Sequence, residues 1–98
     1  MPRYMIVRKF TVTESGMPAV GRRSKEVIAG QFPQVVWEHS HVVVGSDGTP
    51  KSFCIYEAPS EEMVREHADR LGDHVVATIY EVAGDVSPDD FPLTPDPG

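Results

Sequence analysis

Hydrophobic and polar positions alternate along four segments of the chain, and two segments between them carry apolar residues at helical spacing. β-branched and aromatic residues dominate the alternating segments, which is typical of β-strands. We therefore expect strands over residues 3–12, 34–44, 51–57 and 74–83.

A helix is predicted between the first two strands. Val20, Val27 and Ile28 recur at i, i+7 and i+8, so they share one helical face. Pro18 suits the first turn, where its missing N–H is harmless, and Gly30 marks the end of the helix. These residues predict a helix that starts near Pro18 and stops before the second strand.

A second helix is predicted between the third and fourth strands. Ser60 is a favoured N-cap residue, and the two glutamates after it stand where the helix dipole favours negative charge. Val64 and Ala68 belong to its buried face, and Gly72 ends it. The chain therefore alternates strands and helices in the order β-α-β-β-α-β.

This element order predicts an α+β ferredoxin-like domain over residues 1–83. A split βαβ unit of this kind forms a four-stranded antiparallel sheet with both helices on one face. Residues 84–98 are Pro-rich and acidic, which is typical of an extended tail. With 98 residues the chain can bury one modest core, so we expect one domain followed by a C-terminal tail.

The charge and cysteine content exclude several classes of partner. The net charge of −6 argues against nucleic acid and anionic membrane surfaces, because both favour Lys and Arg. No segment approaches the roughly eighteen apolar residues of a membrane span. The single cysteine, Cys54, excludes an intramolecular disulfide, so the cytoplasm is the expected location.

The hairpin between the second and third strands carries the candidate chemistry. Asp47–Gly48 is a signature of a two-residue hairpin turn. With that turn, His41 lies opposite Cys54 and His39 lies opposite Tyr56. Side chains alternate across a strand, so these four residues share one face of the sheet.

Two imidazoles and a thiolate on one face form a candidate metal site. Cβ atoms of opposed residues lie about 4.5–5.5 Å apart, and metal–ligand bonds of roughly 2.0–2.3 Å then allow one ion to be reached from both strands. We predict His39, His41 and Cys54 as ligands. Zinc, copper or nickel would suit such mixed imidazole and thiolate donors.

The opposite face of the hairpin is expected to form the core under the helices, because it carries Val42, Val44, Phe53 and Ile55. The His/Cys face, with Trp37, would then be left open. An uncovered face of this kind indicates a partner, and the commonest partner is a second copy related by a two-fold axis. We therefore predict a homodimer in which two sheets pack face to face as a dimeric α/β barrel.

Three sequence motifs resemble a family of short bacterial proteins. The motifs are Trp37-Glu-His-Ser-His-Val42, Lys51-Ser-Phe-Cys-Ile-Tyr-Glu-Ala-Pro-Ser60 and Arg65-Glu-His-Ala68. The family's best-described members are small nickel-binding proteins with a dimeric ferredoxin-like fold. The resemblance covers most of residues 3–83 and implies nickel as the metal.

The resemblance also implies site residues, and the chain departs from the family pattern in places. It places five residues at family motif positions: His39, Cys54, Tyr56, Glu57 and His67. Tyr56, Glu57 and His67 are therefore additional candidate ligands. His41 stands where the family usually has Tyr, Val7 stands where many members have Glu, and the loop from Gly45 to Pro50 is longer.

Three functions compete on these observations. The leading hypothesis is a non-catalytic metal-binding protein for storage, buffering or sensing, and we do not expect an enzyme. An alternative is a dimeric α/β-barrel enzyme acting on a small hydrophobic molecule, with His39, His41 or Tyr56 as the acid/base group. A third is a homodimeric interaction module. A cavity of a few hundred cubic ångströms would favour the enzyme, and convergent His and Cys atoms would favour metal.

Overall fold

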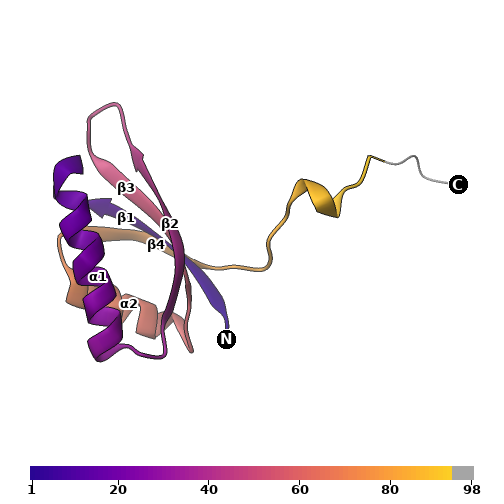
Figure 1. Cartoon of the computed structure of the whole chain (residues 1–98), viewed down its shortest axis with the longest axis horizontal. Helices are drawn as coiled ribbons and strands as arrows, with labels where there is room; N and C mark the ends of the chain where they lie inside the picture. The colour runs from indigo at the N-terminus through magenta and orange to yellow at the C-terminus, as the bar shows by residue number, and fades with distance from the viewer. Residues whose placement is uncertain (94–98) are drawn as a thin grey trace, which may run out of the picture.

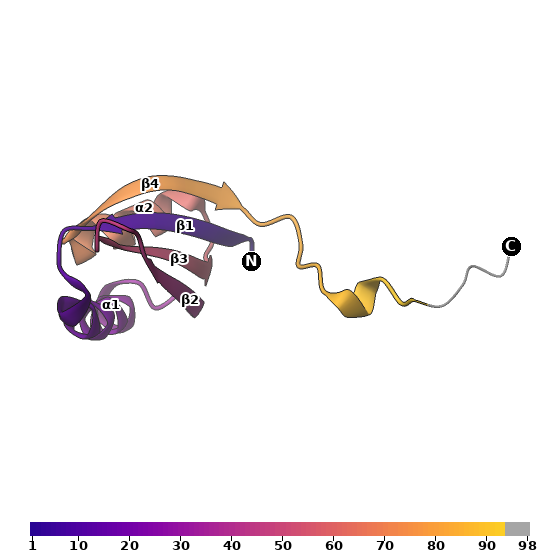
Figure 2. The same ribbon diagram turned by 90° about the horizontal axis from the view of Figure 1, so that it is seen from above.

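The computed structural model describes residues 1–93 as a four-stranded sheet with two helices packed on one side (Figures 1 and 2). The strands are β1 (Arg3–Phe10), β2 (Val36–Val44), β3 (Pro50–Glu57) and β4 (His74–Glu81). The helices are α1 (Met17–Gln31) and α2 (Glu61–Leu71). All six elements lie where the sequence pattern predicts them.

The sheet has the strand order β2-β3-β1-β4. β1 lies in the middle and pairs antiparallel with both β3 and β4, while β2 and β3 form the antiparallel hairpin. Both β-α-β crossovers therefore skip one strand. This arrangement confirms the predicted α+β ferredoxin-like fold.

The helix ends follow from local sequence. Pro18 lies in the first turn of α1, as predicted. At the start of α2 the Ser60 side chain accepts a hydrogen bond from the Met63 N–H at 3.3 Å, and Glu61 and Glu62 stand in the first turn. Gly72 closes α2 with φ at 72°, a backbone conformation that costs glycine little.

Alternation along β1 defines the two faces of the sheet. The helix face carries the residues that pack beneath the two helices: Tyr4, Ile6, Arg8 and Phe10 of β1, and Ser52, Cys54 and Tyr56 of β3. The open face carries the residues on the other side: Met5 and Val7 of β1, His39, His41 and Val43 of β2, Phe53 and Ile55 of β3, and Thr78 and Tyr80 of β4. The main core lies between the helix face and α2, where Val64 and Ala68 are buried.

The hairpin register differs by one residue from the predicted one. Val44 pairs with Pro50, so the loop spans residues 45–49. The Gly48 N–H donates to the Gly45 carbonyl at 2.9 Å, and the Thr49 N–H donates to Asp47 Oδ1 at 2.9 Å. The turn therefore runs from Gly45 to Gly48, with Asp47 as its third residue and Gly48 as its last. The sequence pattern predicts instead a turn with Asp47 and Gly48 as its two central residues.

This shift reverses the predicted role of β3. His41 pairs with Phe53, and Cys54 pairs with Ser40. Because one residue of slip exchanges the faces of a strand, Phe53 and Ile55 lie on the open face, and Cys54 lies under the helices. The prediction that His41 faces Cys54 is wrong, as is the prediction that Phe53 and Ile55 form the core under the helices.

A β-bulge at Glu38 separates Trp37 from the histidines. Trp37 pairs with Tyr56, but His39 already pairs with Ile55, so Glu38 is an extra residue in β2. Trp37 consequently lies on the helix face with Tyr56, whereas His39 lies on the open face. The predicted sharing of one face by these residues is also wrong.

The chain beyond β4 leaves the domain as an extended arm (Figures 1 and 2). Arg3 donates to Asp85 Oδ2 at 2.7 Å where the arm departs. A short 3₁₀ turn, η2 (Pro88–Asp90), follows, and Phe91 beyond it is exposed. The predicted tail also includes residues 94–98, which lie outside the described residues. Within residues 1–93, no helix is long and apolar enough to cross a membrane.

Candidate functional site

The predicted His/Cys cluster is divided between the two faces of the sheet. His39 and His41 are exposed neighbours on the open face, with ring centroids 5.4 Å apart in an edge-to-face arrangement. Cys54 is 3% exposed and lies on the helix face. The sheet itself therefore separates the thiol from the two imidazoles within one chain.

The three additional candidate ligands do not complete a cluster either. Tyr56 and His67 are fully buried on the helix side, with ring centroids 5.5 Å apart. Glu57 is the last residue of β3 and lies opposite Arg3 of β1 and Val36 of β2 in the strand register. In the part of the chain that the structure describes, no three His, Cys, Asp or Glu side chains are grouped closely enough to hold a metal ion.

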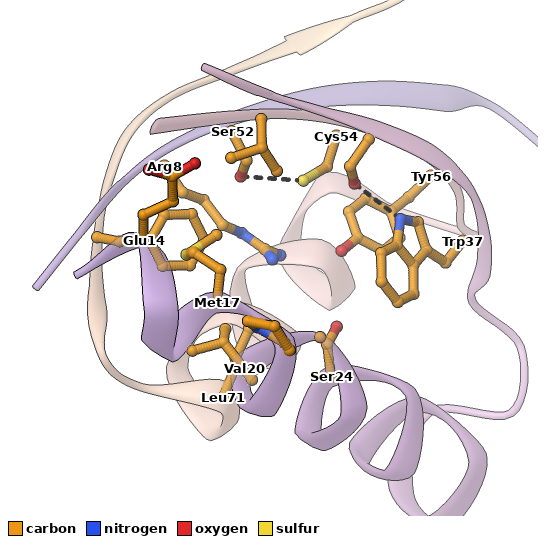
Figure 3. Close-up of a pocket in the computed structure, with 15 residues that line it drawn as sticks. Arg8, Glu14, Met17, Val20, Ser24, Trp37, Ser52, Cys54, Tyr56 and Leu71 are labelled. Atoms are coloured by element: carbon orange, nitrogen blue, oxygen red, sulfur yellow. Dashed lines mark hydrogen bonds between the residues drawn. The ribbon is translucent and has the colours of Figure 1, made fainter. Parts of the chain in front are cut away.

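A cavity of about 410 Å³ lies between α1 and the helix face of the sheet. Its apolar wall includes Phe10, Val20 and Leu71. Its polar lining includes residues of β1, β3 and α1, which Figure 3 shows around one space: Arg8, Ser24, Ser52 and Tyr56. The sequence interpretation missed this site because it assigned the other face of β3 to the helices.

Arg8 is the central polar group of this cavity. Its side chain is 2% exposed, and its guanidinium lies over the Tyr56 ring at 5.4 Å. Arg8 Nη2 donates to His67 Nδ1 at 3.4 Å, and His67 Nε2 lies 3.3 Å from Ser24 Oγ. Because Nδ1 accepts from the arginine, the proton of a neutral His67 belongs on Nε2, where it can be donated to Ser24.

Burial fixes the charge state of the groups around Arg8. Desolvation, aided by the Arg8 charge, lowers the pKa of His67 to about 4, so the imidazole is neutral at pH 7. Desolvation raises the pKa of Tyr56 to about 12, so the phenol is neutral as well. Arg8 is therefore the one charged member of the Arg8, His67 and Tyr56 group. A phenol with this raised pKa is also a poor general base near neutral pH, which weakens the case for Tyr56 as an acid/base group.

The remaining polar groups near the cavity have local partners. The Cys54 thiol lies 3.2 Å from Ser52 Oγ. Trp37 stacks on Tyr56 at 6.3 Å between ring centroids and donates from Nε1 to Ser40 Oγ at 2.8 Å. Cys54 thus behaves as a small buried residue with a weak hydrogen bond.

One signal in the sequence could have revealed this site. β1 carries Tyr4, Ile6 and Phe10 at alternate positions, and Arg8 stands in the same row. An arginine in the buried row of a central strand is rare, because burying an unpaired charge is costly. That break in the pattern marks the polar centre of the cavity.

Comparison with known proteins assigns the family. The family model described as "Nickel responsive protein SCO4226-like" matches residues 4–82. The chain belongs to the nickel responsive SCO4226-like family. No curated protein matches the chain. The family match agrees with the resemblance that the sequence motifs carry.

A solved structure supports the fold. This chain is similar to the crystal structure of SCO4226 from Streptomyces coelicolor A3(2), with a TM-score of 0.63 and 22% sequence identity. The match covers 86% of this chain and 99% of that chain. At this identity the similarity establishes a shared fold, so the site must be argued from the residues of this chain.

Proposed function

We propose that this SCO4226-like protein is a non-catalytic, nickel-binding homodimer that buffers or senses the metal, with His39 and His41 as its metal-binding residues. The observation that carries the proposal is that two exposed imidazoles lie side by side, with 5.4 Å between their ring centroids, in a chain that belongs to a nickel responsive family. The lone thiol of Cys54 fits a reducing compartment, so we place the protein in the cytoplasm.

The donor set fits nickel and related ions. Residues i and i+2 of a strand point to the same side, about 7 Å apart along the chain. Imidazole nitrogens bind at roughly 2.0–2.1 Å, so rotation about the side-chain bonds can direct both rings at one ion. Imidazole suits nickel, copper and zinc. Cys54 is left out of this proposal, because it lies on the helix face.

A second copy of the chain is the partner proposed for the open face. Apolar surface is exposed across this face, by Val43 of β2 beside the histidines and by Val75 and Tyr80 of β4 at the other edge. Lys9 and Lys51 lie opposite each other at one end of this face. At the other end Glu57 lies opposite Arg3, whose guanidinium already forms ion pairs with Glu38 and Asp85. A two-fold axis that sets the strands of the two copies antiparallel would bring each lysine end toward a glutamate end.

Replacing either open-face histidine should weaken nickel binding. We expect His39→Ala and His41→Ala each to lower the affinity for Ni²⁺ by about tenfold or more, since even groups that only orient ligands contribute this much. Calorimetric titration of the full chain, purified without a His-tag, measures the affinity of each variant.

Two variants serve as controls for this titration. Cys54→Ala and His74→Gln should bind Ni²⁺ as the wild type does, because Cys54 lies across the sheet and His74 pairs with Phe10 at the other edge. If Cys54→Ala loses the ion while the histidine variants retain it, the metal site is not on the open face and the proposal fails.

The dimer is tested by a charge placed on the open face. Tyr80 is 58% exposed in the single chain, so Tyr80→Asp should leave the fold intact and prevent dimerisation by burying an unpaired carboxylate. Sedimentation velocity at micromolar concentration should give the mass of two chains for the wild type and of one chain for Tyr80→Asp. Val86→Asp, in the extended arm, should remain dimeric. A monomeric wild type would contradict the proposal.

A further inference from the structure

We propose that the cavity between α1 and the sheet is a binding site for a small amphipathic carboxylate, with Arg8 as the group that recognises its charge. This site lies on the opposite side of the sheet from the proposed nickel ligands and is independent of them. Three features carry the proposal: an unpaired buried charge, two buried polar atoms without partners, and an apolar chamber of suitable size.

The first feature is the uncompensated charge of Arg8. No Asp or Glu within residues 1–93 forms an ion pair with it. Glu14 lines the cavity but is exposed at its rim. His67, to which the guanidinium donates from Nη2, is uncharged at pH 7. Buried charges in proteins are usually paired, because leaving one unpaired is strongly destabilising.

The second feature is a pair of unsatisfied donors. Among the described residues, Arg8 Nε and the Tyr56 hydroxyl are buried without a hydrogen-bond partner. Figure 3 shows the guanidinium and the phenol oxygen directed into the same space above α1. A carboxylate accepts several hydrogen bonds and supplies the negative charge that would pair with Arg8. A water molecule would satisfy a donor without neutralising the arginine.

The third feature is the shape and lining of the chamber. At about 410 Å³ the cavity lies within the range of small-molecule sites. One side of the cavity has an apolar wall formed by Phe10, Met17, Val20 and Leu71. A ligand with one anionic end and a compact apolar body therefore fits. A metal cation is disfavoured by the arginine, and a bare phosphate would leave the apolar wall without a contact.

Sodium octanoate is the probe for this site, with 1-octanol as the uncharged comparison. Trp37 is the single tryptophan of the chain and lines the cavity, so its fluorescence reports occupancy directly. We expect octanoate to change Trp37 emission saturably at pH 7 and to bind about tenfold or more tightly than 1-octanol, since charge-assisted hydrogen bonds are the stronger ones. Equal binding of the two probes, or an unsaturable response to octanoate, would overturn the proposal.

Matched variants separate the cavity from non-specific effects. Arg8→Gln should bind octanoate about tenfold or more weakly and no longer distinguish it from 1-octanol, and it should fold because a buried charge is removed. Arg22→Gln, which removes an exposed arginine from α1, should bind as the wild type does. Tyr56→Phe should weaken octanoate less than Arg8→Gln does. Equal losses in the Arg8 and Arg22 variants would overturn the assignment.

The nickel site and the cavity can fail separately. His39→Ala should retain full octanoate affinity, because His39 lies on the open face. Arg8→Gln should retain the affinity for Ni²⁺ for the converse reason. If His39→Ala loses octanoate binding while Arg8→Gln keeps it, the anion binds on the open face and the cavity assignment is wrong.

Discussion

Acidification from pH 7.0 to pH 4.5 should lower the free energy of unfolding by roughly 2.5 kcal/mol through His67 alone. Burial lowers the pKa of this imidazole to about 4 in the folded protein, against about 6.5 in an unfolded chain. The unfolded state therefore binds a proton that the folded state excludes as the pH falls through this window. The stabilisation is complete above about pH 6.5 and is lost progressively down to about pH 4.

Urea unfolding of the wild type and of His67→Gln at both pH values measures this contribution. Glutamine cannot titrate, so the variant should lose roughly 2.5 kcal/mol less on acidification than the wild type does. His74→Gln is the comparison, because burial also lowers the pKa of His74 and this histidine is half-exposed. The same pH dependence in the wild type and His67→Gln would show that folding does not lower the pKa of His67.

Ile6→Ala should lower the free energy of unfolding by about 3 kcal/mol. Ile6 is fully buried in the central strand, between Cys54 of β3 and Ile79 of β4. Removing its side chain loses burial and leaves a cavity that strands bonded on both sides cannot close. Chemical denaturation at pH 7 gives the value.

Val44→Ala is the matched control for this substitution. Val44 is also an aliphatic strand residue, but it is 44% exposed at the end of β2 and lies outside the proposed dimer face. Its loss should change stability by less than about 0.5 kcal/mol, as is usual for surface positions. Equal effects of the two substitutions would mean that the core is not centred on β1.

The order and type of the elements could be predicted because each leaves a local pattern. Ser60 and Gly72 mark the ends of α2 through their side chain and backbone preferences, which depend on few neighbours. Likewise, Pro18 suits the first turn of α1 and would disrupt the interior of a helix. These local preferences do not depend on the tertiary contacts of the chain.

The face on which Cys54 lies could not be predicted from the same kind of pattern. In β3 both alternate rows are apolar, with Phe53 and Ile55 in one and Cys54 and Tyr56 in the other. Hydrophobicity therefore does not decide which row the helices cover. The register that the hairpin turn sets decides it. Because Asp47 bonds to Thr49 and lengthens the loop, the register moved by one residue and divided the expected site.

The two irregular positions at the margins of the sheet bear on how the protein avoids uncontrolled aggregation. β2 and β4 are the edge strands, and each carries one extra residue: Glu38 in β2, and Ala77 in β4 between the partners of Val7 and Arg8. Such bulges bend an edge away from the flat, continuous ladder on which another chain could add a strand. Both margins are thereby protected against the addition of a strand from another copy, which disfavours fibre-like growth.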